Sequence, residues 1–101
     1  MSDFADVKID EKIKVVTREP GKYKVVMLND DKTPMEFVME VLMHIYKHNS
    51  VEAEEVTMSI HTEGAGIAGV YPFDIAEQKS KETLSLSKEH GFPLKVKVEK
   101  A

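Results

Sequence analysis

The stretch from residue 27 to residue 36 constrains the fold of this chain most, because it joins two apolar segments of different period. Residues 23–28, before it, form a short apolar run that is typical of a strand. After it, apolar residues recur at helical spacing at Phe37, Val38, Val41, Leu42 and Ile45. The stretch is therefore predicted to be a tight connection from a strand into a helix.

This connection concentrates polar groups and ends in a helix start signal. Residues 29–31, Asn-Asp-Asp, place two carboxylates and one carboxamide on a short loop. Thr33 is predicted to cap the helix, with Pro34 at its first position and Glu36 completing a T-x-x-E capping box. A loop held on both sides in this way can aim its polar groups at something outside the protein.

Length and composition restrict the classes of protein to consider. A chain of 101 residues, 42% of them hydrophobic, is expected to form one domain with a shallow surface site rather than a deep cavity. It has no cysteine for a disulfide or a thiol nucleophile. No signal peptide and no apolar run of the roughly 20 residues that span a membrane is present, so a cytoplasmic protein without membrane contact is expected. The net charge of −4, with one arginine, argues against nucleic acid and favours a positively charged ligand.

The pattern along the chain predicts an α+β fold in the order β-α-α-β-α-β, with the strands sharing one sheet and the helices covering one face. Strands are expected at residues 23–28, 66–71 and 93–99. Helices are expected at residues 34–47 and at residues 73–90. Between them, a helix is expected to begin at a cap formed by Ser50 and to end just before Gly64. In the last helix, the apolar positions expected to face inward are Ile75, Ala76, Leu84 and Leu86.

Residues 1–21 differ from the rest of the chain. They are rich in Asp, Lys and Glu, with isolated apolar residues, and they end at Pro20-Gly21. A short strand around Ile13, Val15 and Val16 is compatible with this composition. We expect a flexible N-terminal extension at 1–21 and a single core domain at 22–101.

Asn29 and Asp30 alone are typical turn residues, but His61, near the end of the second predicted helix, adds a third polar group. A carboxylate accepts a charge-assisted hydrogen bond from an ammonium group. The Asn29 side chain can accept from an amine and donate to a carbonyl, and a neutral His61 presents a lone pair. With apolar residues around them, these three groups suit the free α-amine of a peptide whose first side chain is apolar.

At this point the sequence resembles a known family. Residues 23–38 (Tyr-Lys-Val-Val-Met-Leu-Asn-Asp-Asp-Lys-Thr-Pro-Met-Glu-Phe-Val) are similar to the signature of ClpS, the bacterial N-end rule (N-degron) adaptor of the Clp protease. The resemblance continues to Ala101 through Ile60-His61, residues 64–70, residues 76–79 and residues 93–101. It implies three helices on a three-stranded antiparallel sheet, and a monomeric adaptor without catalysis or cofactor.

The resemblance also implies roles for individual residues. The α-amine receptors would be Asn29, Asp30 and His61. The pocket for the first side chain (Leu, Phe, Tyr or Trp) would be lined by Met35, Val38, Thr57, Ile60 and Leu94, with Met35 excluding β-branched side chains. Asp31 and Thr33 would hold the loop or touch the peptide backbone. Asp74 and Lys79 match the face that docks on the N-terminal domain of a Clp unfoldase of the ClpA or ClpC type.

Two positions depart from the family pattern. Thr57 stands where many members have methionine, which predicts a wider or differently shaped pocket and an altered ranking among Leu, Phe, Tyr and Trp. Residues 71–74, Tyr-Pro-Phe-Asp, replace the Thr or Ser cap usual at the start of the last helix.

Three other interpretations were weighed against the adaptor. A hydrolase needs a serine beside His61, but Ser59 is two residues away, so on a helix the two side chains point apart. His44 and His48 are four residues apart, as in a zinc site on a helix, but no third ligand is evident, and two exposed histidines at a helix end are the favoured interpretation. A non-catalytic interaction domain like the C-terminal domain of the ribosomal stalk protein has a related element order but needs no polar loop.

Overall fold

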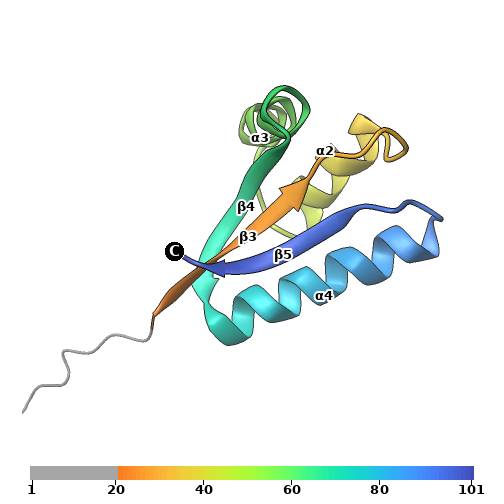
Figure 1. The fold of residues 1–101 in the computed structure, drawn as a ribbon. Coiled ribbons are helices and arrows are strands. Elements are labelled where there is room, and N and C mark those ends of the chain that lie inside the picture. Colours follow the sequence, from red (N-terminus) through yellow and green to blue (C-terminus); the bar gives the residue numbers. More distant parts are fainter. Residues whose placement is uncertain (1–20) are drawn as a thin grey trace, which may run out of the picture.

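The computed structural model describes residues 21–101, and the predicted N-terminal extension lies outside the described residues except for Gly21. The elements follow the predicted order (Figure 1). The strands are β3 (Lys22–Leu28), β4 (Ala65–Pro72) and β5 (Lys95–Lys100), and the helices are α2 (Met35–His44), α3 (Ser50–Glu63) and α4 (Phe73–Glu89).

The three strands form one antiparallel sheet in the order β4-β3-β5, which confirms the α+β prediction. The central strand β3 buries Val25 and Met27 in the core, because alternate residues of a strand face the same side. In β4 the register shifts: Val25 is opposite Gly69 and Val26 is opposite Ile67, so Ala68 is the extra residue of a β-bulge.

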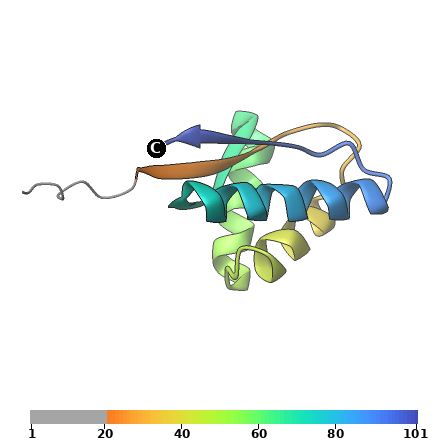
Figure 2. The same cartoon turned by 90° about the horizontal axis from the view of Figure 1, so that it is seen from below.

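Helices α2 and α4 lie on one side of the sheet in Figure 2, and α3 begins on that side. Helix α4 packs against all three strands, while α3 packs against β4 and α2. Helix α3 is seen nearly end-on in Figure 1, and its C-terminal half extends beyond the sheet toward the open side. The sheet therefore has one covered face and one open face, with the end of α3 beside the open face.

Helix α2 ends three residues earlier than predicted, at His44. Lys79 of α4 donates from Nζ to the carbonyl of Ile45 at 2.8 Å, and Lys47 has a left-handed backbone with φ 61°. Both features end the helix. His44 and His48 are consequently not on one helical face, and His44 instead pairs through Nδ1 with Glu40 at 3.2 Å. Within residues 21–101, no three His, Asp or Glu side chains are grouped to hold a metal ion.

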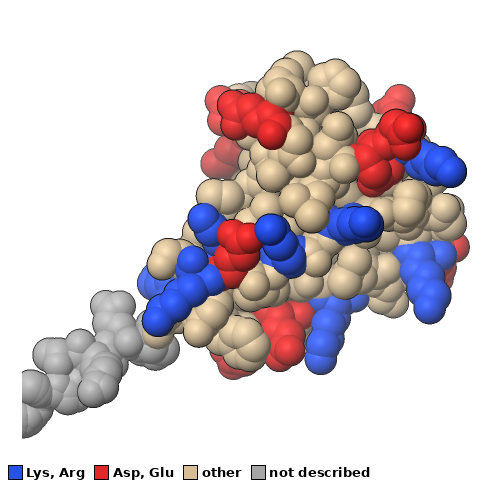
Figure 3. Space-filling view, viewed as in Figure 1, with Lys and Arg blue, Asp and Glu red and all other residues tan. Residues whose placement is uncertain are grey.

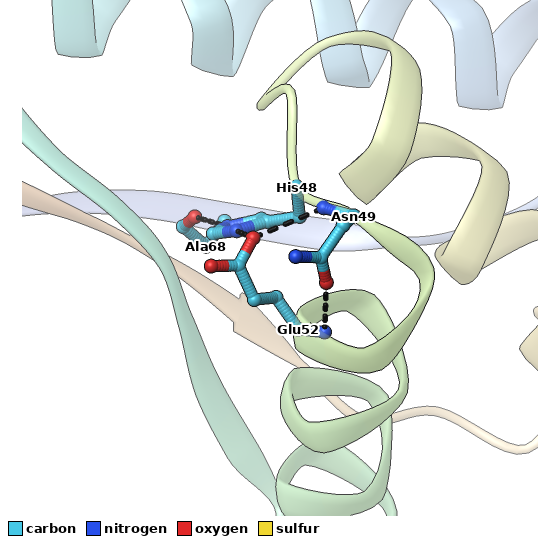
Figure 4. Close-up of polar contacts among 4 residues, drawn as sticks. All are labelled: His48, Asn49, Glu52 and Ala68. Carbon is cyan, nitrogen blue, oxygen red and sulfur yellow. Dashed lines mark hydrogen bonds and ion pairs between the residues drawn. The ribbon is translucent and has the colours of Figure 1, made fainter.

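The start of α3 is fixed by a side-chain cluster on the turn after α2 (Figure 4). Asn49, not Ser50, is the N-cap: its Oδ1 accepts from the Glu52 N–H at 2.8 Å, and its own N–H donates to Glu52 Oε1 at 3.0 Å. His48 Nε2 donates to the carbonyl of the bulge residue Ala68 at 2.6 Å, and its Nδ1 lies 3.5 Å from Glu52 Oε1. The cluster ties α3 to β4.

Helix α4 buries small residues rather than the large apolar ones that its sequence suggested. Ile75 and Leu84 are exposed and Leu86 is half-buried, so of the four expected inward positions only Ala76 is fully buried. The other buried residues are Ser80, Thr83 and Ser87. Small side chains let the helix lie close to the sheet it crosses. No helix among the described residues is long and apolar enough to span a membrane.

Candidate functional site

A small hollow lies where the end of β3, the following loop, the start of α2 and the second half of α3 meet. It is lined by residues from these segments and by one residue just before β5: Leu28, Asn29, Asp30, Thr33, Met35, Val38, Thr57, Ile60, His61 and Leu94. The structure thus brings together the three proposed α-amine receptors and all five proposed pocket residues. Leu28 was missed by the sequence analysis, where it counted only as a strand residue.

The loop that carries Asn29 and Asp30 is held by backbone and side-chain hydrogen bonds. The Asn29 N–H donates to the carbonyl of Gly64 at 2.9 Å, so the loop begins against the end of α3. The carboxylate of Asp30 accepts from the N–H groups of Lys32 and Thr33 through Oδ1, both at 2.8 Å. Its Oδ2 accepts from the Thr33 hydroxyl at 2.8 Å. A carboxylate has about four acceptor positions, so about one remains for a ligand.

These contacts keep Asp30 ionised. Partial burial by itself raises the pKa of this carboxyl, but the hydrogen bonds from Thr33 and Lys32 and the positive charge of Lys95 outweigh it. The net effect is a pKa below the usual value for aspartate. The side chain is only partly exposed, so an ammonium group placed beside it meets a negative charge that is already oriented.

The same contacts correct the predicted start of α2. Thr33 does not cap the helix, because its hydroxyl donates to Asp30 instead. Pro34 occupies the cap position, with an extended backbone and no side-chain hydrogen bond. Its carbonyl accepts from the N–H groups of Phe37 and Val38, at 3.1 and 3.2 Å. Thr33 therefore organises the loop and not the helix.

The wall of the hollow is apolar. Val38, Ile60 and Leu94 are buried, and Thr57 is buried as well. The hydroxyl of Thr57 donates to the carbonyl of Ala53, one turn earlier in α3, at 2.7 Å. Because its proton is committed to the backbone, Thr57 adds no free donor to the wall, and the surface suits an apolar side chain.

The hollow is narrow in this structure, with about 20 Å³ of free space. That is little more than the 10–15 Å³, roughly, that one water molecule needs, and far less than a Leu or Phe side chain. Met35 is the lining residue best placed to move, since it is 41% exposed and unbranched. The hollow must therefore widen before a bulky side chain can enter it.

Three of the predicted functional residues lie elsewhere. Asp31 is exposed on the loop but does not line the hollow. Asp74 is exposed in the first turn of α4. Lys79 is half-buried, with its ammonium group bound to the Ile45 carbonyl and placed 5.9 and 5.4 Å from the ring centroids of Tyr46 and Tyr71.

Comparison with known proteins finds one matching family. Residues 18–97 match the family described as "ATP-dependent Clp protease adaptor protein ClpS". The chain is 41% identical to the Clp protease adapter ClpS of Wolinella succinogenes, over 94% of this chain and 93% of the relative. It is 46% identical to that of Campylobacter jejuni, over 80% and 84%. Among solved structures it is similar to Agrobacterium tumefaciens ClpS2 bound to L-phenylalaninamide, with a TM-score of 0.79 and 42% identity over 82% of this chain and 100% of the other.

Proposed function

The chain belongs to the ClpS family of ATP-dependent Clp protease adaptors, and from this premise we propose that its hollow binds the N-terminal residue of N-degron substrates. Family membership makes it a non-catalytic adaptor, so the hydrolase and ribosomal-stalk interpretations are set aside. The observation that carries the proposal is the meeting of Asn29, Asp30 and His61 with an apolar wall in a single hollow. Like the N-terminal residue of such a substrate, the L-phenylalaninamide bound by the Agrobacterium relative has a free α-amine and a bulky apolar side chain.

In this proposal the α-amine lies against the polar side of the hollow. Asp30 accepts from the ammonium group with its remaining acceptor position. Asn29 accepts from the amine and donates to the first carbonyl, and His61 accepts through a ring nitrogen. Thr33 acts through Asp30 by holding its carboxylate. Asp31 does not line the hollow, so its part is limited to the loop or to the peptide backbone outside it.

The first side chain of the substrate then displaces Met35 and lies against Val38, Thr57, Ile60 and Leu94. Burying a Leu or Phe side chain contributes about 1.5–3 kcal/mol. Each charge-assisted hydrogen bond adds about 1.5–3 kcal/mol before ordering costs are subtracted. Two or three such bonds with one buried side chain correspond to a Kd on the order of micromolar or somewhat tighter.

We further propose that the start of α4 docks on the N-terminal domain of a Clp unfoldase of the ClpA or ClpC type. Exposed Asp74 is available for a direct contact. Lys79 already uses one N–H on Ile45, so it contributes mainly by holding the end of α2 against α4. Asp74→Ala is expected to weaken binding to the isolated unfoldase domain while leaving peptide affinity unchanged. Loss of both would contradict a separate docking face.

The proposal places the protein in the cytoplasm as a monomer, with residues 22–101 as the adaptor core and residues 1–21 as an extension used in delivery.

The test of substrate binding is calorimetric titration with peptides that differ only in the first residue. Peptides that begin with Phe, Leu, Tyr or Trp are expected to bind, and those that begin with β-branched Ile or Val are expected to bind at least about tenfold more weakly. Equal affinity for all first residues would contradict a side-chain pocket.

A further inference from the structure

A second, larger hollow lies on the open face of the sheet, under the projecting half of α3. Its free space is about 570 Å³, within the range of ligand sites. Val26, Leu28 and Ile67 form an apolar floor on β3 and β4, and Val56 of α3 forms part of the wall. We call this hollow the sheet groove. Gly66 makes room for the close approach of α3, because a Cβ there would lie 2.7 Å from the side chain of Ile60.

The sheet groove borders the proposed amine site at Leu28. Leu28 lines both hollows, with Asn29 and Asp30 beyond it on one side and Val26 on the other. A substrate whose first residue occupies the amine site is a chain, so its later residues must leave over the rim of that site. At Leu28 this rim meets the apolar floor of the sheet groove.

We propose that the substrate chain passes over Leu28 and that its residues from about the third to the sixth lie in the sheet groove. This inference rests on the proposed binding of N-degrons at the amine site. From Leu28 to Lys24 the groove follows four steps of β3, which an extended peptide covers with about four residues at roughly 3.3 Å each.

The charges around the sheet groove define the segment that fits. Lys97 and Lys24 lie 2.8 and 3.9 Å from the Glu99 carboxylate, so this one carboxylate offsets part of the positive charge at the far end. Glu55 and Glu63 of α3 border the other side. In Figure 3, mostly uncharged surface lies below α3, acidic side chains lie beside α3, and basic side chains with an acidic group among them lie over the strands. The groove therefore takes an apolar segment without acidic side chains next to α3.

Weak contacts in the groove suffice because the segment is tethered. Once the first residue is bound, the following residues are held near the groove at an effective concentration on the order of millimolar. A groove that binds a free peptide too weakly to detect can then strengthen binding of a continuous substrate.

The test compares three proteins and three peptides by calorimetry. The proteins are the parent chain, Ile67→Ser and the matched control Val70→Ser. Both residues lie on β4 and are 47% exposed, but only Ile67 lines the sheet groove. The peptides are Phe-Ala-amide, a hexapeptide that continues with Leu-Val-Leu-Ala, and a hexapeptide that continues with Gly-Ser-Gly-Ser.

The parent chain is expected to bind the apolar hexapeptide about tenfold more tightly than the other two peptides. Ile67→Ser is expected to bind the apolar hexapeptide about fivefold more weakly than the parent, while Val70→Ser binds it as tightly as the parent. Phe-Ala-amide is expected to bind all three proteins with the same affinity. Equal Kd values of the parent for the three peptides, or equal losses in both variants, would overturn the inference. So would an Ile67→Ser variant that changes self-association in sedimentation and not peptide affinity, because the groove would then be covered by a second copy. Failure of the parent to bind Phe-Ala-amide would instead reject the amine site itself.

Discussion

The hydroxyl of Thr33 donates a 2.8 Å hydrogen bond to the carboxylate of Asp30, which fixes the orientation of the one acidic side chain among residues 21–101 that lines the amine site. Sequence pattern alone assigned this threonine to the start of α2. The contact therefore stabilises the connection between β3 and α2, residues 29–34, and also orients the negative charge of the ligand site. It also makes Asp30 more acidic than an ordinary aspartate.

Replacing Thr33 by Val is therefore expected to raise the pKa of Asp30 and to weaken binding of a Phe peptide by about tenfold. Thr33→Ser, which keeps the hydroxyl, should retain both properties. Thr62→Val is the matched control, since the Thr62 hydroxyl bonds to the Met58 carbonyl on the exposed side of α3. The measurement is an NMR titration of the Asp30 carboxyl carbon, combined with calorimetry. An unchanged pKa in Thr33→Val would contradict the assigned role.

The sign of the pH dependence follows from the lowered pKa of Asp30. The ionised form is favoured by folding, so its contribution to stability is fully present above the unfolded pKa of about 3.9. That contribution is lost as the pH falls through the lower folded pKa. In an acid titration, Thr33→Val should thus lose peptide binding at a higher pH than the parent.

Thr57→Met is expected to narrow the pocket and to change the ranking of first residues. Thr57 is buried in the wall, and its hydroxyl is already bonded to Ala53. A longer side chain there fills space that a large ring needs, so affinity for Phe, Tyr and Trp should fall more than affinity for Leu. Thr57→Val, of similar size, should leave the ranking unchanged. An identical ranking in Thr57→Met would show that this position does not select the first side chain.

The structure and the sequence pattern assign different residues as the N-cap of α3, and a stability measurement distinguishes the two assignments. Asn49→Ala should lower the free energy of unfolding by about 1 kcal/mol, because the Glu52 N–H loses its partner. Ser50→Ala, the change at the cap expected from sequence, should cost less than about 0.5 kcal/mol. Chemical denaturation of both variants measures the difference. A larger loss for Ser50→Ala would reverse the assignment.

Removal of each of two buried hydroxyl groups in α4 is expected to change the free energy of unfolding in opposite directions. Ser87 is 1% exposed and its Oγ has no hydrogen-bond partner among the described residues, so Ser87→Ala should raise the free energy of unfolding by about 1 kcal/mol. The Thr83 hydroxyl instead donates to the Lys79 carbonyl and lies 2.7 Å from the hydroxyl of Tyr46.

Thr83→Ala should consequently destabilise the protein by about 1–3 kcal/mol, since it removes a hydrogen-bond partner of a buried tyrosine. Burial already raises the pKa of Tyr46 to about 12. Denaturation of both variants under the same conditions provides the test. Equal changes of the same sign would mean that the two hydroxyls are in similar environments.

The fold was predictable because each element carried its own periodicity. The apolar run of β3 and the helical spacing after Pro34 set the order of elements, and the positions of Asn29 and His61 in that order brought them to one end of the sheet. The elements' ends were less predictable, because they depend on distant partners. Lys79, which is 34 residues from Ile45 in the sequence, donates a hydrogen bond to the Ile45 carbonyl at the end of α2.

The buried face of α4 was mispredicted for a related reason. Hydropathy selects Ile75 and Leu84, but a helix that lies across three strands needs small side chains at the points of contact. Ser80 and Thr83 meet that need and look like surface residues in a sequence. Leu28 was overlooked because an apolar residue at the end of a strand gives no sign that it borders two hollows.

The most direct test of the central claim is the affinity of the parent chain and of Asp30→Asn for one Phe peptide, with its α-amine either free or acetylated. The amine carries the charge that Asp30 is placed to accept. For the parent, acetylation is expected to weaken binding by at least about a hundredfold. Asp30→Asn should weaken binding of the free peptide strongly and leave little further loss on acetylation. Equal binding of the free and acetylated peptides by the parent chain would contradict recognition of the α-amine at this site.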